Sequence, residues 1–178
     1  VTGVTLSREQ LAYARNRIRK AGLDKLVTLE FRDYRDIAEE YDHIVSIEMF
    51  EAVGERYWPL YFEKLGKCLR PGGKAALQII TIDGNAYHYY RRRTDFIQRY
   101  IFPGGELDNI GNTLQVMEQM RFEVHDVENL REHYAYTTRD WCKRLTARSA
   151  DAEAELGPER TRLWRAYLAG CSIAFEEG

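Results

Sequence analysis

Four short segments at the ends of predicted strands carry the residues that could do chemistry. They are Thr5-Leu6-Ser7, Asp33-Tyr34-Arg35, Ile47 to Glu51 and Gln78 to Ile82. If these strands are parallel, the four segments lie beyond the carboxyl ends of one sheet, which is where such sheets bind their ligands. Acidic and polar side chains gathered there can hold a ligand or accept a proton. This placement indicates a site without reference to any family.

The elements that must position these residues are predicted from the spacing of apolar residues. Strands are expected at 1–5, 26–31, 43–48, 74–82 and 122–129. Helices are expected at 8–20, 55–69, 87–100, 110–120, 137–147 and 159–176. Strands that alternate with helices favour an α/β fold with a mainly parallel sheet. The segment 83–120 interrupts the alternation, and we expect it to be an insertion.

Local signals fix some element ends. Ser7 and Gln10 fit a capping box, in which the serine caps the third helical amide and the glutamine side chain reaches back. Gly22 is expected to stop this helix. The segment Arg70-Pro71-Gly72-Gly73 has the composition of a turn. The aromatic and leucine residues of 55–69 recur at helical spacing, which predicts one buried helix face.

Composition excludes several classes of protein. The chain has 178 residues, of which 44% are hydrophobic and 30% charged, so it is typical of one globular domain and not of a disordered chain. A net charge of −2 argues against binding to nucleic acid through bulk positive charge. No apolar run approaches the roughly 20 residues of a membrane-spanning helix.

Three cysteines, Cys68, Cys142 and Cys171, lie far apart with no metal-ligand spacing. This pattern predicts reduced thiols in a cytoplasmic protein and no metal site. The first residues, Val1 to Thr5, begin within an expected strand, and Gly178 directly follows an expected helix. We therefore expect the chain to be a fragment of a longer protein.

Seven short motifs occur along the whole chain in a consistent order. They are Val4 to Gln10, Asp33 to Asp36, Ile44 to Gly54, Arg70 to Gly73, Tyr100 to Gly105, Tyr134 to Trp141 and Tyr167 to Cys171. This series resembles the cyclopropane-fatty-acid synthases, the family of the cyclopropane-fatty-acyl-phospholipid and mycolic acid cyclopropane synthases. The pair FEAVG and YIFPGG is far more specific than a general methyltransferase signature.

The resemblance implies a Rossmann-like class I S-adenosylmethionine-dependent methyltransferase fold, with helices on both faces of a mainly parallel sheet. The family's glycine-rich loop after its first strand is not found, and Gly72-Gly73 and Gly104-Gly105 lie in the wrong places to replace it. The resemblance therefore implies that residues 1–178 are the C-terminal part of a methyltransferase catalytic domain that lacks its first strand here.

The implied reaction transfers a methyl group to the double bond of an unsaturated phospholipid acyl chain. The product cation must lose a proton before a cyclopropane ring can close, and the family is thought to use a bound bicarbonate as the base. The resemblance assigns the ion to four positions, Glu51, Tyr134, Gln78 and Ile80. Many members have histidine where Gln78 stands, and a glutamine carries no titratable proton. A methyl-branched or methylene product is therefore an alternative.

The resemblance also implies residues that bind S-adenosylmethionine. Thr5 and Leu6 end the first visible strand, where the ribose is expected, and Gln10 reaches up from the following helix. Tyr34 and Arg35 match positions on the adenine side. Ile47 precedes the loop that contains Glu51. Ordinary packing in the core is the alternative for Leu6 and Ile47.

The segment from Tyr87 to Phe102 is aromatic, then basic, then apolar. It is expected either to touch anionic phospholipid headgroups, as a peripheral contact at the inner face of a bacterial membrane, or to be a helix packed by its aromatic residues. The sequence indicates no nucleic acid partner and leaves open a homo-oligomer. Two further alternatives are methylation of a small molecule and a non-enzymatic interaction fragment without cofactor.

Overall fold

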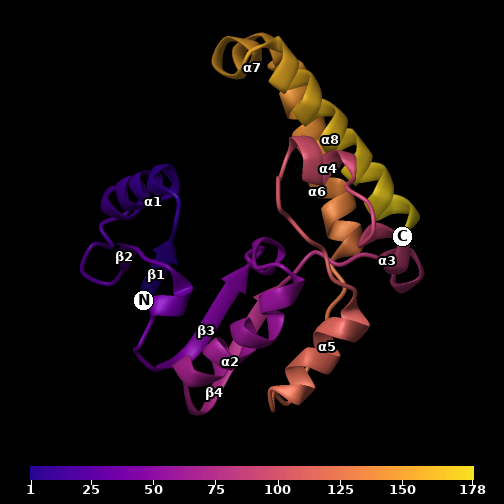
Figure 1. Ribbon diagram of the computed structural model, residues 1–178. Helices are drawn as coiled ribbons and strands as arrows, with labels where there is room; N and C mark the ends of the chain where they lie inside the picture. Colours follow the sequence, from indigo (N-terminus) through magenta and orange to yellow (C-terminus); the bar gives the residue numbers. More distant parts are fainter. The chain divides into compact units, whose positions relative to one another are not determined.

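The computed structural model describes all residues from 1 to 178. They form two compact units, one made of residues 1–45 and 60–76 and the other of residues 46–59 and 77–178. In chain order the strands and helices are β1 (Thr2–Thr5), α1 (Arg8–Lys20), β2 (Thr28–Phe31), β3 (Tyr41–Ile47), α2 (Trp58–Cys68), β4 (Leu69–Gln78), α3 (Gly84–Tyr90), α4 (Phe96–Tyr100), α5 (Ile110–Gln119), α6 (Arg131–Ala147), α7 (Ser149–Leu156) and α8 (Pro158–Glu177) (Figure 1).

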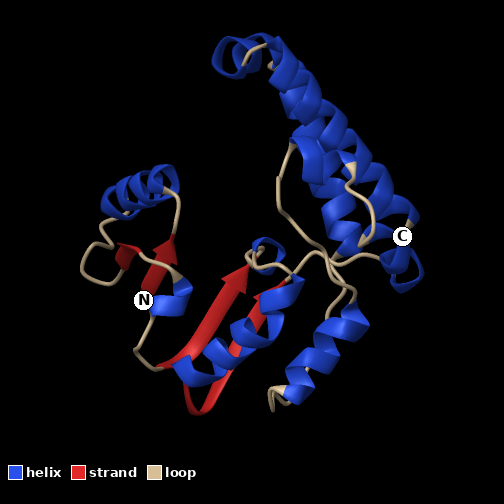
Figure 2. Cartoon of the chain, viewed as in Figure 1, coloured by secondary structure: helices blue, strands red, loops and turns tan.

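The strands form two pairs, β1 with β2 and β3 with β4 (Figure 2). The first pair is parallel, from Thr2 opposite Thr28 to Thr5 opposite Phe31. In the second pair, Arg70 binds Asp42 at the start of β3, and the Glu48 N–H, just after its end, donates to the Gln78 carbonyl at 2.9 Å. The β3 and β4 strands therefore run in the same direction. The sequence predicted one mainly parallel sheet, and the parallel pairing is found within two separate pairs.

Helix α1 begins and ends where the local signals predicted. The Ser7 hydroxyl accepts the Gln10 N–H at 3.1 Å, and Gly22 takes a φ of +68° directly after the helix. A positive φ is open to glycine at little cost. The second half of the predicted capping box is wrong, because the Gln10 side chain accepts the Thr5 hydroxyl instead of reaching back to Ser7.

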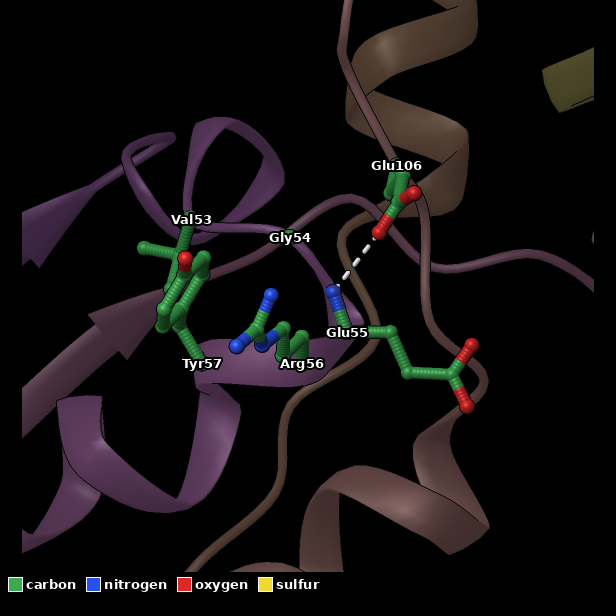
Figure 3. Close-up of a pocket in the computed structure, with 6 residues that line it drawn as sticks. All are labelled: Val53, Gly54, Glu55, Arg56, Tyr57 and Glu106. Carbon is green, nitrogen blue, oxygen red and sulfur yellow. Dashed lines mark hydrogen bonds between the residues drawn. The ribbon is translucent and has the colours of Figure 1, made fainter.

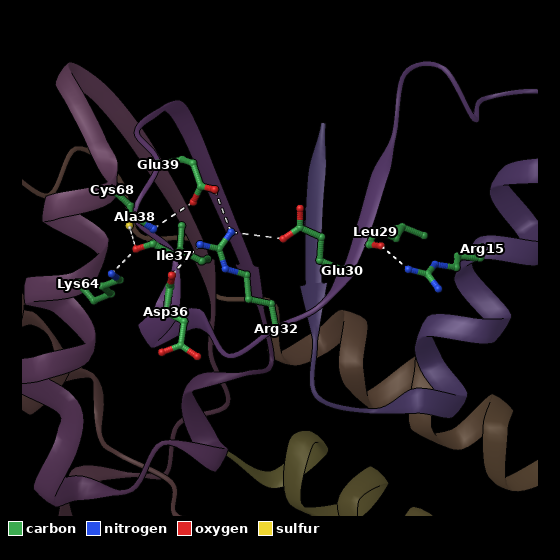
Figure 4. Close-up of polar contacts among 10 residues, drawn as sticks. All are labelled: Arg15, Leu29, Glu30, Arg32, Asp36, Ile37, Ala38, Glu39, Lys64 and Cys68. Carbon is green, nitrogen blue, oxygen red and sulfur yellow. Dashed lines mark hydrogen bonds and ion pairs between the residues drawn. The ribbon is translucent and has the colours of Figure 1, made fainter.

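A set of polar contacts fastens the loop after β2 (Figure 4). Arg32 binds Glu30 at 3.3 Å and Glu39 at 3.0 Å, and it donates to the Asp36 carbonyl at 2.6 Å. The hydrogen bond from Arg32 lowers the pKa of Glu39 to about 2. One guanidinium thus ties the end of β2 to the chain that leads into β3.

Two further contacts attach helices to this unit. The Ile37 carbonyl accepts from the Lys64 ammonium and lies 3.8 Å from the Cys68 thiol, both on α2 (Figure 4). On α1, Arg15 donates to the Leu29 carbonyl of β2 at 2.9 Å. The backbone of β2 and the following loop is therefore held by side chains of two helices.

The aromatic stripe predicted for the segment 55–69 is the most buried part of the chain. Along α2 its buried members are Trp58, Tyr61, Phe62 and Leu65. Tyr61 meets Tyr34 edge to face, with ring centroids 5.6 Å apart. Burial of each such side chain stabilises a fold by roughly 1.5–3 kcal/mol, so this stripe anchors the surrounding elements.

In the second unit, α6 and α8 lie side by side (Figure 1). Small residues are buried on both helices, Ala135 and Thr138 on α6 and Ser172 on α8, and the Ser172 hydroxyl donates to the Ala135 carbonyl at 3.5 Å. Small side chains let two helix backbones approach closely. No helix of the chain combines the length and the apolarity needed to cross a membrane.

Two predictions for irregular regions were wrong. Residues 122–129 form no strand, and Val124 and Val127 are exposed, because alternation alone provides no partner strand. The helix predicted at 87–100 is two helices, α3 and α4. The Asp95 side chain accepts the Gln98 N–H at 2.7 Å in a complete capping box, and this starts α4 afresh.

Other boundaries differ by a few residues. The strand predicted at 74–82 is β4, which starts at Leu69 and so includes the expected turn. The helix predicted from 137 begins six residues earlier, at Arg131, where the Asn129 side chain accepts the Arg131 N–H at 2.9 Å. Helix α7 was not predicted, whereas α8 closely matches its predicted range.

Candidate active site

Glu51 lies in a short 3-10 turn, Phe50–Ala52, that follows β3. The turn is anchored by Phe50, which is 1% exposed and stacks on Trp58 with ring centroids 5.2 Å apart. One carboxylate oxygen of Glu51, Oε1, accepts the Ile80 N–H at 2.6 Å. The other, Oε2, is buried and has no hydrogen-bond partner. A buried, unpartnered carboxylate oxygen is unusual in a protein and points to a functional role.

The surroundings of Glu51 change its acidity. Burial raises the pKa of Glu51 above its ordinary value, and the nearby charge of Glu48 raises it further. The hydrogen bond from Ile80 opposes this rise without cancelling it. Burial and the like charge of Glu48 both disfavour the ionised form of Glu51. A positive charge placed beside the two carboxylates would offset both effects.

The segment Pro103 to Glu106 holds the Glu51 turn in place. The Glu106 N–H donates to the Glu51 carbonyl at 2.8 Å, and the Glu106 carboxylate accepts the Glu55 N–H at 2.6 Å (Figure 3). The Glu55 side chain in turn binds Arg91 at 2.6 Å. Glu106, the residue directly after YIFPGG, thus binds Glu51 within FEAVG and Glu55 directly after it, on both sides of Gly54.

An open cavity of about 540 Å³ adjoins this junction (Figure 3). Gly54 adopts a φ of +83°, which a residue with a side chain rarely takes. The residues that line the cavity are Val53, Gly54, Glu55, Arg56, Tyr57 and Glu106. The cavity is therefore built from the turn beside Glu51 and not from Glu51 itself.

Three side chains meet beyond the ends of β3 and β4. The Gln78 amide donates to Glu48 Oε1 at 3.2 Å and also to the Tyr134 hydroxyl, and that hydroxyl donates to the same Glu48 oxygen. Glu48 has a backbone φ of +48°. A non-glycine residue in this conformation is uncommon, and strained residues of this kind cluster at functional sites.

Aromatic side chains of α8 stand beside this cluster. The Tyr134 ring lies 5.3 Å from the ring of Phe175. Burial, the hydrogen bond to Glu48 and the charges of Glu48 and Glu51 raise the pKa of Tyr134 to about 12. Burial, together with Cys171 and the charge of Glu48, also raises the pKa of Tyr167. Both phenols therefore stay protonated at neutral pH.

The structure brings the four predicted catalytic positions together in two contacts, Glu51 with Ile80 and Gln78 with Tyr134. All four belong to the second unit. Sequence reasoning missed Glu48 and Glu106. Glu48 lies within a segment already flagged as a strand end, so its position was a usable signal. Nothing in the local pattern around Glu106 predicted that its carboxylate would bind a backbone amide 51 residues away.

Most of the predicted cofactor residues lie in the first unit, after β1 and β2. The Thr5 hydroxyl donates to the Gln10 side chain at 2.8 Å and accepts the Ser7 N–H at 3.1 Å. Tyr34 and Arg35 lie in the 3-10 turn Tyr34–Asp36, where Asp33 binds Arg35 through both carboxylate oxygens, at 3.0 and 2.6 Å. Arg35 is thus held in one orientation by its neighbour.

Two apolar residues at strand ends are unusually exposed. Leu6 follows β1 with 61% of its surface exposed, and Ile47 ends β3 with 57% exposed. Ile47 belongs to the second unit. The alternative for these two residues, ordinary packing in the core, does not fit this exposure. The prediction that they bind the cofactor stays a prediction.

A family model described as mycolic acid cyclopropane synthetase matches residues 1–178. The chain belongs to this family. The resemblance found in the seven motifs is therefore confirmed. Among its relatives, a probable fatty acid methyltransferase from Pseudomonas putida is 42% identical over 184 residues, covering 100% of this chain and 46% of the relative.

Two other relatives in this mycolic acid cyclopropane synthetase family have names that state different activities. A tuberculostearic acid methyltransferase from Mycobacterium tuberculosis is 40% identical, covering 100% of this chain and 42% of the relative. A cyclopropane-fatty-acyl-phospholipid synthase from Escherichia coli K12 is 33% identical, covering 98% of this chain and 44% of the relative. The chain thus spans less than half the length of these relatives.

Solved structures of the family confirm the predicted fold. A mycolic acid cyclopropane synthase complexed with SAH and CTAB has a TM-score of 0.90 at 28% identity, and a cyclopropane synthase from Mycobacterium tuberculosis has 0.91 at 26%. Each alignment covers 100% of this chain and 66% of the other. The fold is that of the Rossmann-like class I S-adenosylmethionine-dependent methyltransferases.

Proposed function

We propose that the protein containing this chain transfers a methyl group from S-adenosylmethionine to the double bond of an unsaturated fatty acyl chain of a phospholipid. The observation that carries the proposal is the cluster of Glu48, Glu51, Gln78 and Tyr134 beyond the ends of β3 and β4. Membership of the family and relatives that are fatty acid methyltransferases support it.

The residues at the strand ends suit the cofactor. S-adenosylmethionine, when bound, supplies a methyl carbon made electrophilic by its sulfonium. In the first unit Leu6 offers exposed apolar surface and its neighbours Thr5 and Gln10 offer polar atoms, and in the second unit Ile47 is exposed as well. The residues that would hold it are Thr5, Leu6, Gln10, Tyr34, Arg35 and Ile47.

The two carboxylates explain how the site handles positive charge. Methylation of an alkene leaves a cation on the acyl chain, and its formation is favoured by fixed negative groups. Glu51 Oε2 is buried without a partner, and Glu48 lies close enough to affect the pKa of Glu51. The rings of Tyr134 and Phe175 add π faces, which also attract cations. The cluster therefore stabilises the charge that the reaction creates.

The bicarbonate that the resemblance implied does not fit the residues present. An anion must be held by N–H or O–H donors. Both N–H groups of the Gln78 amide, the Tyr134 hydroxyl proton and the Ile80 N–H are already donated within the cluster. A further anion would also meet two carboxylates. We therefore derive no step through bicarbonate.

Two products can follow from the same cation. Loss of a proton from the added methyl group with ring closure gives the predicted cyclopropane acyl chain. The relatives at 40% and 42% identity are named as fatty acid methyltransferases, and they favour a second candidate, a chain that carries a methyl or methylene branch and keeps one double bond, formed when the cation loses a proton without ring closure. Gln78, in place of the usual histidine, is consistent with either outcome because its amide serves only as a hydrogen-bond donor here.

The phospholipid would approach from the cytoplasmic face of a membrane. Helix α3 ends at Tyr90, and the three arginines that follow include Arg92 and Arg93, which are exposed, whereas Arg91 is paired with Glu55. Tyr89 is also exposed. Exposed basic and aromatic side chains favour contact with anionic headgroups, so we propose a peripheral membrane contact at this segment.

The test uses the full-length protein, S-adenosylmethionine labelled in its methyl group, and vesicles of unsaturated phospholipid. We expect label in the acyl chains, and none with vesicles of saturated phospholipid. Without a hydride donor the cation can only lose a proton, so the cyclopropane, the methylene product and a methyl-branched alkene have the same formula, and NMR separates them. Label that appears only in a small molecule, or in no product, would overturn the proposal.

A further inference from the structure

Glu48 accepts the two side-chain hydrogen bonds of the site, from Gln78 and from Tyr134. We propose that Glu48 is the general base of the reaction, a carboxylate of the chain itself that stands where a bound anion would otherwise act. The proposal rests on the function proposed above. It assigns a proton acceptor to a position that neither composition nor motif singled out.

The first argument is geometric. Glu48 Oε1 accepts from the Gln78 amide at 3.2 Å and from the Tyr134 hydroxyl, and its backbone N–H donates to the Gln78 carbonyl at 2.9 Å. Gln78 and Tyr134 come from β4 and α6, so two elements fix one carboxylate oxygen. A φ of +48° brings the side chain into this position at a cost in backbone strain. Such strain persists where surrounding contacts hold it, and at Glu48 those contacts are the two donors.

The second argument is elimination among the neighbours. Gln78 carries no titratable proton, and Ile80 contributes only a backbone amide. Tyr134 is kept protonated by burial and by Glu48, which raise its pKa to about 12. Glu51 commits one oxygen to Ile80, and the other is enclosed. Glu48 is exposed, so a proton that it receives can pass on to solvent.

The proposed step balances as follows. After methyl transfer, one C–H bond of the added methyl group breaks, and its electron pair forms a bond to the cationic carbon, which closes the ring. If a hydride first shifts to the cation, the same electron pair forms the double bond of a methylene group instead. In both cases the proton goes to the Glu48 carboxylate, which becomes a carboxylic acid and then releases the proton to solvent.

The experiment compares Glu48→Gly and Glu48→Gln in the full-length protein, with Glu118→Gln on the exposed side of α5 as the control. Labelled methyl transfer to unsaturated phospholipid is measured in buffer freed of carbon dioxide and again with added bicarbonate. Glycine accepts a positive φ without strain, but Glu48→Gly also removes the acceptor of the Gln78 amide and the Tyr134 hydroxyl. The melting temperature of both variants is therefore measured together with the rate, so that a loss of activity is separated from a loss of fold.

We expect wild type and Glu118→Gln to be equally active with and without bicarbonate. Both Glu48 variants should lose roughly 10²–10⁴-fold in rate, the usual contribution of a general base. Added bicarbonate should restore part of the rate in Glu48→Gly, because the amide of Gln78 and the hydroxyl of Tyr134 become free. It should not do so in Glu48→Gln, whose side chain still fills the position.

Four results would overturn the proposal. One is a wild-type rate that depends on bicarbonate, and another is a Glu48→Gln or Glu48→Gly rate equal to wild type without bicarbonate. The third is loss of rate in both variants without rescue of Glu48→Gly, because a residue that only positions Gln78 and Tyr134 would give this result. The fourth is a wild-type protein that labels no acyl chain under either condition, which overturns the proposed function as well.

Discussion

Replacement of Glu51 by glutamine separates the charge of this residue from its shape. The glutamine oxygen can still accept the Ile80 N–H, which donates to Glu51 at 2.6 Å, and the Phe50–Trp58 stack that anchors the turn is untouched. The variant loses a negative charge beside the carbocation that forms on the acyl chain. A preorganised group of this kind contributes on the order of 10²-fold in rate, or about 3 kcal/mol of transition-state stabilisation.

The same substitution has a defined effect on stability. Burial raises the pKa of Glu51 above its ordinary value of 4.5, so the folded protein binds this proton more tightly than the unfolded chain does. The free energy of unfolding therefore falls as pH rises from about 4.5 through the raised pKa. The free energy of unfolding of Glu51→Gln does not fall in this way, because glutamine does not titrate. At neutral pH it should melt at the same temperature as wild type or higher, and the difference should vanish below pH 4.5.

The assay pairs labelled methyl transfer with calorimetric melting of the full-length protein between pH 4 and pH 8, with Glu118→Gln as the control. A slow variant that melts no lower than wild type would support the role of the charge. Wild-type turnover would remove Glu51 from the chemistry. A melting temperature well below that of wild type at neutral pH would show that the charged form is stabilised in the fold, contrary to the burial argument.

Three further substitutions test the surroundings of the site. Tyr134→Phe removes the hydroxyl that donates to Glu48 and keeps the ring against Phe175; turnover should fall at least tenfold, and the free energy of unfolding from urea titration should change by only about 1 kcal/mol. Trp58→Ala removes a side chain that is 3% exposed and should cost about 3–5 kcal/mol of stability by the same titration. Glu106→Ala leaves the Glu55 N–H without its acceptor and should cost about 1–3 kcal/mol and slow turnover, whereas Glu106→Gln should retain most of both. A Glu106→Ala protein with wild-type rate would show that this contact does not position Glu51.

The parts of the fold that were predictable are those with local causes. Helix α1 is bounded by the Ser7 cap and by Gly22, and α2 buries a stripe visible in the sequence as Trp58, Tyr61, Phe62 and Leu65. The strand expected at 122–129 failed because a strand needs a partner, which no local pattern supplies. The break between α3 and α4 depends on the capping box at Asp95, which also involves Gln98 three residues on and was overlooked.

The ends of the predicted strands located the site, and the family resemblance named most of its residues. The resemblance led to Gln78 and Tyr134, which are 56 residues apart and touch in the structure. It did not lead to Glu48, because that contact requires a backbone turned to positive φ so that the side chain meets both donors. Conformations of this kind arise from the packing of several elements, and a single non-glycine residue gives no sign of them.

The Glu106 contacts have a consequence for exchanging parts between relatives. The segment 83–120 carries Glu106, whose backbone and side chain fasten the turn that contains Glu51. A chimera that imports this segment from another family member thus changes two things at once. It replaces the surface of the segment, and it replaces the hydrogen bonds that hold the turn containing Glu51. Altered products in such a chimera would report on a displaced carboxylate as much as on new contacts to lipid. Grafts that retain Glu106 and Arg91 separate the two effects. They keep the hydrogen bond from the Glu55 N–H to Glu106 and the ion pair between the Glu55 side chain and Arg91.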